Sequence, residues 1–324
     1  MKTAFDLSFR GEIEMNNPMH SFAWVAEHFK KTNLYEAEPI KFYNTRLVSR
    51  TADHFRKYGI YTDIEPDKDP IAWREFWDRE EYRRRYGITL NLKQPEGGGL
   101  SDKDLLPLWI PGKLYGCLNY APIIRVKDDS LDTVDTKTAL EQAIAQKSKS
   151  VDHFKQVEEL FKELEVNVVG ETATDFMDFW DGHFHYWVAQ EFSNRIGLDM
   201  LVFKARRKGF SYVGAWDAYD GIDLNPFYKV FLVAFDLKYL TDDGGLFSFC
   251  KRFHDHMYKH TDWAKDTLIN NESTLKLGYR HPGSDVDRGF QSSIVCYSAM
   301  NNPDCIRGKL ANKIKWEELG TFPN

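Results

Sequence analysis

The chain has 324 residues, a length typical of about two domains. Hydrophobic residues make up 42% of it, enough to form a buried core, and this excludes a largely disordered chain. The formal net charge of −6, from 43 lysines and arginines and 49 aspartates and glutamates, excludes a protein that coats DNA through a globally basic surface, so any nucleic-acid contact must be local.

The first 125 residues or so are aromatic and irregular in pattern. Residues 72–86 are predicted to form one amphipathic helix with Trp73, Phe76 and Trp77 on a common face. The basic run Arg83 to Arg85 at its end has two interpretations. It is either a contact for nucleic acid or, as is more usual for charged helical positions, a solvated face beside the preceding glutamates.

The middle of the chain is predicted to contain a helical connector. A glycine-rich loop is expected over 95–104, and the alternation of apolar residues predicts a short hairpin over 108–126. Apolar residues three and four apart over 136–165 predict a long amphipathic helix, or two helices with a break. The expected organisation is an N-terminal region of residues 1–134, a helical connector of residues 135–165 and a C-terminal domain of residues 166–324.

Beyond residue 166 short apolar runs alternate with helical patterns, as in an α/β domain built on a parallel sheet. Strands are predicted at 200–203, 230–235, 275–279, 293–297 and 314–316. A helix is predicted over 245–259, followed by a polar stretch, and a surface loop over 281–289. Because the chain stops soon after the last strand, without a closing helix, we expect a doubly wound domain that is incomplete at its C-terminal end.

The apolar runs are all short and the cysteines are few. A run such as Val230 to Phe235 cannot cross a bilayer, and the N-terminus lacks the layout of a secretory signal. The four cysteines have no CxxC spacing, which is typical of reduced, buried thiols. We therefore expect a cytosolic protein with no membrane contact and no structural zinc.

Residues 199–221 have the layout of a phosphate loop: an apolar strand, a basic loop with a glycine, a serine and a segment compatible with a helix. Against the pattern GxxxxGK[ST], residues 204–211 match only at Gly209 and Ser211. Lys204 takes the place of the first glycine and Phe210 that of the usual lysine, but an ammonium at the start of the loop still reaches the β and γ phosphates. The alternative is a basic turn between a strand and a helix.

In the segment 305–324, two glutamates, Glu317 and Glu318, directly follow a predicted strand. A Walker B site needs such a pair, one acid for the Mg²⁺ shell and one to polarise the attacking water. Paired glutamates after a strand more often simply open the next helix. The order of a phosphate loop near 204, several strands and an acidic strand end near 317 favours the ATPase interpretation.

With these motifs the chain resembles the large terminase subunits of tailed bacteriophages. The resemblance is strongest in KARRKGFSY and in RGK shortly before KIKWEELGTFPN, and it extends to EFWDREEYRRRYG and GKLYGCLNYAPI near the N-terminus. It implies a P-loop ATPase sheet of the ASCE type, incomplete at the C-terminus, next to an aromatic-rich mixed α/β N-terminal region. The family's C-terminal nuclease domain has no counterpart in these residues.

The resemblance also implies roles for particular residues. The catalytic set is Lys204, Arg207, Glu317 and Glu318, with Mg²⁺ held by Ser211 and Glu317. The phosphate-binding set is Lys204, Arg206, Arg207, Lys208, Gly209, Phe210 and Ser211. Two residues depart from the family pattern: Glu317 stands where an aspartate is usual, and Trp316 replaces a smaller aliphatic residue.

Two further groups of residues have competing interpretations. Upstream of the loop, Trp180, Tyr186 and Gln190 are candidates for adenine recognition, because a glutamine amide both donates to and accepts from the adenine edge, or they are core residues. His254, His256 and His260 fall on one predicted helix, but no HExxH motif accompanies them and a metal site there is the less favoured interpretation.

The function implied by the resemblance is hydrolysis of ATP, with Mg²⁺, coupled to packaging of double-stranded DNA into a viral capsid. The implied partners are double-stranded DNA, a small terminase subunit, the portal protein and further copies of the chain in a ring, in the cytoplasm of a bacterial host. One alternative is another P-loop translocase or helicase. Another is a noncatalytic DNA- or protein-binding module whose loop merely holds a phosphate.

Overall fold

The computed structural model describes residues 45–90, 108–126, 172–202, 209–300 and 302–318. The chain divides into one unit formed by Met1–Pro122 with Phe176–Asn324 and a smaller one formed by Ile123–Asp175. Strands β3 (Pro122–Val126) and β4 (Thr172–Phe176) form a two-stranded sheet. The loop predicted over 95–104, the helix predicted over 136–165 and the domain boundaries predicted near 134 and 165 lie outside the described residues.

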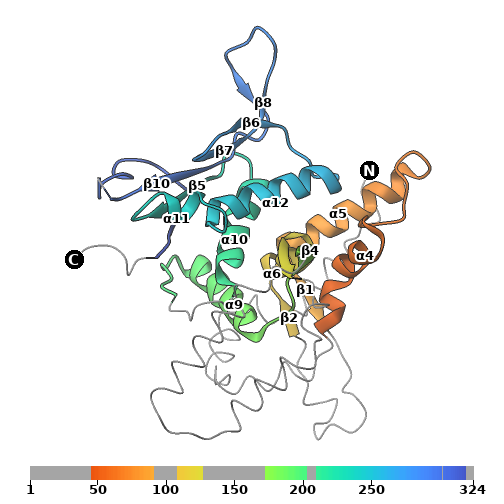
Figure 1. Cartoon of the computed structure of the whole chain (residues 1–324). Coiled ribbons are helices and arrows are strands. Elements are labelled where there is room, and N and C mark those ends of the chain that lie inside the picture. The colour runs from red at the N-terminus through yellow and green to blue at the C-terminus, as the bar shows by residue number, and fades with distance from the viewer. Residues whose placement is uncertain (1–44, 91–107, 127–171, 203–208, 301, 319–324) are drawn as a thin grey trace, which may run out of the picture. The chain divides into compact units, whose positions relative to one another are not determined.

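The larger unit contains a mixed five-stranded sheet in the order β11-β5-β10-β7-β6 (Figure 1). Its strands are β5 (Lys229–Ala234), β6 (Thr267–Asn270), β7 (Thr274–Leu277), β10 (Ser293–Ser298) and β11 (Lys313–Trp316). Strands β11, β5 and β10 are parallel, whereas β7 runs antiparallel to both β10 and β6. The expected wholly parallel sheet is therefore wrong. The tight connection between β6 and β7, where Asn271 accepts from Thr274 N at 2.8 Å, forces these two strands to be antiparallel.

Most of the predicted strands are present. The runs at 230–235, 293–297 and 314–316 correspond to β5, β10 and β11. The run at 275–279 contains β7 apart from its first residue, and the first residue of β8 (Tyr279–Arg280). The polar stretch before β7 contains β6, whose side chains are mostly exposed.

The strand predicted over 200–203 is wrong for its described part. Residues 200–202 have no regular structure, and Phe203 lies outside the described residues. Leu201 is 63% exposed and Val202 is 40% exposed, so this apolar run is not buried in a sheet. An apolar run predicts a buried strand only when a neighbouring strand is available to pair with it.

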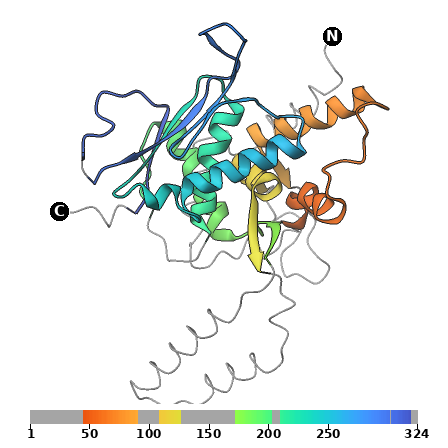
Figure 2. The same ribbon diagram turned by 45° about the horizontal axis from the view of Figure 1, so that its top comes forward.

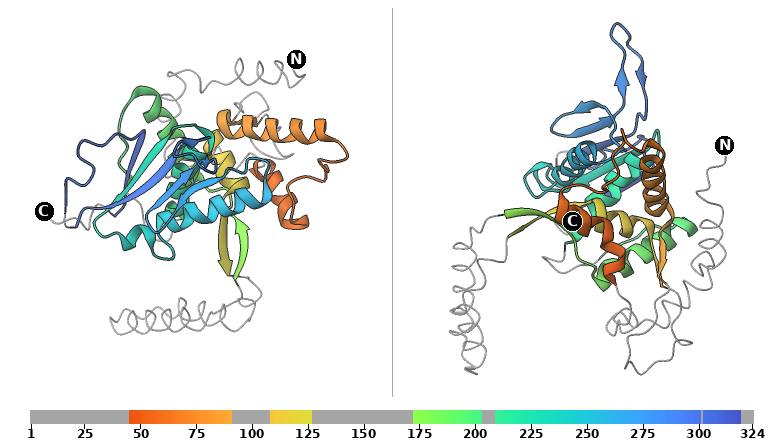
Figure 3. Two further views of the ribbon diagram at one scale, coloured as in Figure 1. Left: turned by 90° about the horizontal axis from the view of Figure 1, so that it is seen from above. Right: turned by 90° about the vertical axis from the view of Figure 1, so that its right-hand side faces the viewer.

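The loop predicted over 281–289 is largely exposed, as expected, but it includes a short strand. Strand β9 (Asp287–Arg288) pairs with β8 to form a two-stranded hairpin that projects from the sheet (Figures 1 and 3). Asp287 stabilises the hairpin by accepting from Lys276 at 2.6 Å and from Arg280.

Two helices pack together against one face of the sheet (Figure 2). They are α10 (Phe210–Leu224) and α12 (Leu246–His260). Helix α12 confirms the helix predicted over 245–259, and a short helix, α11 (Lys238–Thr241), precedes it. The Cys250 thiol donates to the Ala215 carbonyl oxygen at 3.3 Å, and the Trp216 and Phe253 rings meet edge to face. Because α10 is buried from Ala215 to Leu224, its three aspartates, Asp217, Asp220 and Asp223, are buried with it.

The N-terminal part of the larger unit contributes further elements to the same core. They are η2 (Thr45–Ser49), α4 (Arg50–Tyr58), α5 (Pro70–Tyr86), β1 (Ile88–Leu90), β2 (Leu108–Ile110) and α6 (Gly112–Tyr120), with β1 and β2 antiparallel. Helix α5 confirms the helix predicted over 72–86. It begins two residues earlier because Asp69 accepts from Ala72 N at 2.9 Å and Pro70 suits the first helical position.

The hairpin predicted over 108–126 is wrong. The segment is strand β2, helix α6 and strand β3. Nearly every residue of α6 is buried, so its apolar residues do not form the one-sided stripe that identifies a helix in a sequence. Gly116 allows α6 to approach α10 closely, because a Cβ at this position would lie 2.8 Å from the Trp216 indole.

The solvated face favoured for Arg83 to Arg85 is wrong for Arg84. Arg84 is 1% exposed and donates to Asp220 at 2.8 Å and to Asp223 at 2.9 Å. Its guanidinium also lies 4.6 Å from the centre of the Trp263 ring. The middle arginine of the run therefore joins α5 to α10 inside the core.

Across the described ranges, no helix has the length and apolar character needed to span a membrane.

Candidate functional site: a helix start, an acidic strand end and a buried lysine cluster

Helix α10 starts within the segment predicted to bind phosphate. Gly209 is its N-cap with φ +70°, a left-handed conformation that glycine adopts without strain, and Val213 N donates to the Gly209 carbonyl oxygen at 3.2 Å. Ser211 therefore lies in the first turn and is partly exposed. The first-turn N–H groups of a helix point outward beyond its N-terminus, where they favour an anion.

The acidic pair follows the edge strand β11. Glu317 N donates to the Val233 carbonyl oxygen of β5 at 2.8 Å, which extends the parallel pairing by one residue, and Glu317 is partly exposed. Glu318 is exposed and has φ +52°. The two carboxylates thus lie where parallel strands end, the edge at which α/β proteins usually bind ligands.

Tyr186 connects the start of α10 with the end of β11. It belongs to α9 (Asp181–Ile196), its ring centre lies 5.6 Å from that of Phe210, and Lys315 lies near its hydroxyl, where the ammonium opposes the rise in the Tyr186 pKa that burial causes. Phe210 directly precedes Ser211, and Lys315 lies two residues before Glu317. The structure therefore brings together the two chain segments that the sequence selected, through a residue of a third element.

The cations of the predicted phosphate loop lie outside the described residues. These are Lys204, Arg206, Arg207 and Lys208. Phe210 packs edge to face on His183 at 5.1 Å as well as on Tyr186, so the aromatic residue in the usual lysine position is part of the contact between α9 and α10.

The adenine candidates of α9 and its N-cap have different surroundings. Trp180 is 46% exposed and stacks on His183 at 5.2 Å. Gln190 is 6% exposed, and its amide nitrogen donates to Asp217 at 2.7 Å. Gln190 thus contributes to a second group of residues in the middle of α10, which the sequence analysis missed.

This second group is a buried carboxylate surrounded by three lysines, here called the Asp217 cluster. Asp217 is fully buried and pairs with Lys113 of α6 at 2.5 Å, with Lys313 at 2.8 Å and with Lys315 at 2.6 Å. Lys313 and Lys315 are two residues apart in β11, so both point to the face of the sheet that carries α10. Ile314 and Trp316 lie on the other face and are 44% and 40% exposed.

The charged forms of the groups in the cluster are not equally stabilised. Burial alone would raise the pKa of Asp217, but the three lysines lower it well below its usual value. Burial opposes the charge of Lys113 and Lys315 too, yet Asp217 raises the pKa of both. For Lys313, burial and repulsion by the other two lysines outweigh the attraction of Asp217 and lower its pKa to about 7. One carboxylate therefore does not compensate three ammonium groups.

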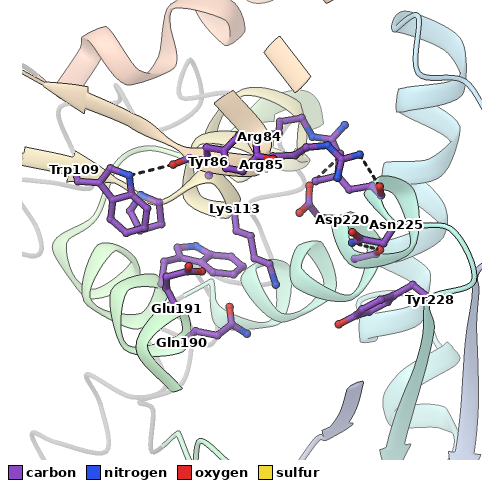
Figure 4. Close-up of a pocket in the computed structure, with 15 residues that line it drawn as sticks. Arg84, Arg85, Tyr86, Trp109, Lys113, Gln190, Glu191, Asp220, Asn225 and Tyr228 are labelled. Carbon is purple, nitrogen blue, oxygen red and sulfur yellow. Dashed lines mark hydrogen bonds and ion pairs between the residues drawn. The ribbon is translucent and has the colours of Figure 1, made fainter. Parts of the chain in front are cut away.

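A pocket of about 270 Å³ adjoins this cluster (Figure 4). The end of α5, the start of α6, helix α9 and the second half of α10 all contribute to its wall. Lys113, Gln190 and Tyr228 extend toward the same space (Figure 4). Trp109 forms another side, held by a hydrogen bond from its indole to the Tyr86 carbonyl oxygen at 3.1 Å.

The three histidines of α12 have separate roles. His254 Nε2 lies 2.7 Å from the Thr267 hydroxyl, whereas His256 Nε2 lies 2.6 Å from the Tyr61 hydroxyl. His260 packs edge to face on Phe55 at 5.0 Å. Within the described ranges, no group of three or more His, Cys, Asp or Glu side chains is arranged to hold a metal ion.

His256→Asn is expected to make the unfolding free energy depend less steeply on pH below about pH 7. Burial, with repulsion from His260 and Lys259, lowers the pKa of His256 from 6.5 to about 3. Between these pH values the unfolded chain binds a proton that the folded protein does not, so the folded state loses about 1.4 kcal/mol per pH unit as the pH falls. Denaturant unfolding between about pH 7 and pH 5 measures this slope. The exposed control His281→Asn should keep the wild-type slope, and an unchanged slope in His256→Asn would contradict the prediction.

A search against protein families found no match for this chain, and a search of curated proteins found no relative.

Proposed function

We propose that this protein binds ATP and hydrolyses it at the start of α10, as the ATPase part of a DNA-packaging motor of the terminase type. The observation that carries the proposal is the contact of Tyr186 with both Phe210 and Lys315, since it joins the first turn of α10 to the end of β11. An ATPase of this class needs phosphate-binding amides and a carboxylate pair at one place.

The residues available suit a nucleotide with Mg²⁺. Ser211 offers a hydroxyl in the first turn, and Glu317 offers a carboxylate that is partly exposed; both are the oxygen ligands that Mg²⁺ prefers. Gly209 at the N-cap has φ +70°, a left-handed backbone conformation that favours glycine over residues with a Cβ. Bound Mg²⁺ supplies charge neutralisation at the phosphate oxygens.

The other roles follow from charge and reach. Glu318, exposed at the end of β11, would accept a proton from the attacking water. Lys204, Arg206, Arg207 and Lys208 would neutralise charge on the phosphates, and the amides of Phe210 and Ser211 would hold them. In the proposed motor this hydrolysis drives double-stranded DNA into a capsid, with a ring of copies, a small terminase subunit and the portal protein as partners.

The experiment is nucleotide binding and turnover. The wild-type protein is expected to bind ATP in the presence of Mg²⁺ and to release phosphate, whereas Lys204→Ala and Glu318→Gln should each lower turnover by at least about tenfold. Ser211→Ala should weaken the dependence on Mg²⁺. Glu272→Gln, an exposed glutamate in the turn between β6 and β7, is the matched control for Glu318→Gln.

Equal turnover in the wild type and in both variants would overturn the assignment of these residues. Tight ATP binding without any turnover would instead favour a noncatalytic module that holds a phosphate. Turnover that is stimulated by single-stranded but not by double-stranded DNA would favour another translocase or a helicase.

A further inference from the structure

The Asp217 cluster has more positive charge than its surroundings neutralise. Among the described residues, Asp217 is the acid within ion-pair distance of Lys113, Lys313 and Lys315. Their side chains are only 26%, 15% and 14% exposed, so water compensates them poorly. A buried surplus of cations persists in a protein when a second anion completes it, and a ligand can be that anion.

The neighbouring carboxylates are engaged elsewhere. Asp220 is paired with Arg84 at 2.8 Å, and Asp223 is shared by Arg84 and Lys265. Glu191 borders the pocket from a partly exposed position, and counting it still leaves a net positive charge on the three lysines and Asp217. No other acidic side chain of the described core therefore balances the surplus, and Lys113 is the lysine of the cluster that lines the pocket.

The pocket offers polar groups that have no partner among the described residues. Gln190 is buried and uses its amide nitrogen on Asp217, while its carbonyl oxygen accepts no hydrogen bond. The indole nitrogen of Trp187, 1% exposed on the pocket wall, donates none. Lys113 spends one of its three N–H donors on Asp217. Buried polar groups left unpaired in this way indicate a missing partner.

We propose that this pocket binds a phosphate group, free or as a monoester, on Lys113 with Lys313 and Lys315 behind it. With all three lysines protonated, the cluster has two positive charges more than Asp217 balances. A phosphate monoester, close to a dianion at neutral pH, balances them better than a carboxylate and favours the charged form of Lys313. The remaining N–H groups of Lys113 and the Trp187 indole supply donors, and the Gln190 oxygen accepts from a hydroxyl on the ligand.

The size of the pocket favours a small organic phosphate. Its 270 Å³ corresponds to about nine water molecules at roughly 30 Å³ each, which leaves room for an organic group next to the phosphate. Tyr228 and Trp109 provide flat apolar surfaces on the wall for such a group.

This site is distinct from the proposed ATP site and does not depend on it. The pocket wall includes Asp220 and Gly221 of α10, whereas Ser211 lies in the first turn of the same helix. Asp220 lies nine positions after Ser211, which is about 13.5 Å along the helix at 1.5 Å per residue. Variants of the two sites therefore separate the two proposals.

The test is binding of inorganic phosphate and of glycerol 3-phosphate, measured by calorimetry and by ³¹P NMR. Lys113→Met is expected to weaken binding by about ten- to a hundredfold. The exposed control Lys259→Met should bind as the wild type does, and Ser211→Ala tests whether the anion lies instead at the start of α10. Tighter binding of glycerol 3-phosphate identifies an ester as the ligand type, and equal binding identifies the free ion. Lys113→Met should remain folded, because Lys313 and Lys315 still pair with Asp217.

Sulfate, which does not titrate in this range, provides a second readout. Lys313 loses its charge as the pH rises through about 7, so sulfate should bind more tightly at pH 6 than at pH 8. In Lys313→Met this dependence should be largely lost. The titratable and charged groups around Lys313 and Lys113 are Asp217, Asp220, Lys315, Tyr186, Tyr228 and Glu191.

Two results would overturn the proposal. One is unchanged phosphate binding in a folded Lys113→Met variant, especially if Ser211→Ala abolishes it, since the anion would then lie at the start of α10. The other is the absence of any phosphate or sulfate binding to the wild-type protein at millimolar concentration.

Discussion

Asp217→Asn is expected to remove about 3–5 kcal/mol of unfolding free energy at neutral pH. The substitution preserves the size of the side chain but removes the carboxylate that pairs with Lys113, Lys313 and Lys315. Three ammonium groups, each at most about a quarter exposed, then face one another without compensation. Leaving buried charges unpaired is among the most destabilising changes that a single substitution makes. Denaturant unfolding monitored by circular dichroism measures the loss.

The dependence of this loss on pH identifies its cause. Without Asp217 the pKa of each lysine falls in the folded protein, so the unfolded chain binds more protons and the stability of the variant rises as the pH rises. The difference between Asp217→Asn and the wild type should therefore shrink from about pH 7 to about pH 10. Asp285→Asn, in an exposed loop, should show no loss at either pH. A difference that is constant with pH would attribute the effect to packing or to the lost Gln190 bond.

Lys313→Met should change stability in the opposite direction. Lys313 is the least compensated member of the cluster, with its pKa lowered to about 7, so removing its charge is expected to raise the unfolding free energy by about 1 kcal/mol. Such a gain would agree with a role for Lys313 in ligand binding rather than in folding. A clear loss of stability in Lys313→Met would contradict the charge surplus on which the phosphate proposal depends.

The sequence predicts the elements that contain either a short continuous apolar run or an apolar stripe with the helical period. Strands β5 and β10 belong to the first kind, since β5 is buried at every position after Lys229, and helix α12 belongs to the second. Helix α6 is missed because it is buried on all sides, and β6 because as an edge strand it is mostly exposed. In both elements burial no longer follows the period that sequence analysis uses.

The candidate site was predictable only in part, for a related reason. The segments around Ser211 and Glu317 are recognisable because each is a short motif that is continuous in the chain. The Asp217 cluster comes from four elements, α6, α9, α10 and β11, whose residues are up to about two hundred positions apart. One signal was available: Lys315 falls in the strand predicted over 314–316 and Lys313 directly precedes it, so the two lysines share a face if the strand begins one residue earlier.

Arg84→Met is expected to lower the unfolding free energy by about 3–5 kcal/mol. Although burial alone would lower the pKa of Arg84, Asp220 and Asp223 raise it, so the guanidinium is charged and holds two buried carboxylates at 2.8 and 2.9 Å. Methionine fills much of the volume but provides no charge. Arg74→Met, at an exposed position of the same helix, is the matched control and should change stability little.

A second substitution separates lost charge from lost packing. Asp223 keeps a cation in Arg84→Met, because Lys265 lies 3.0 Å from it, whereas Asp220 loses its ion-pair partner in the described core. Adding Asp220→Asn to Arg84→Met should therefore recover a large part of the loss, although Asp220→Asn alone should destabilise the protein.

Lowering the pH should also reduce the loss of stability in Arg84→Met. Loss of its cationic partner raises the pKa of Asp220. The difference in unfolding free energy between Arg84→Met and the wild type should therefore shrink as the pH falls toward about 5. Additive losses in the double variant, with no effect of acid, would instead assign the role of Arg84 to its packing against Trp263.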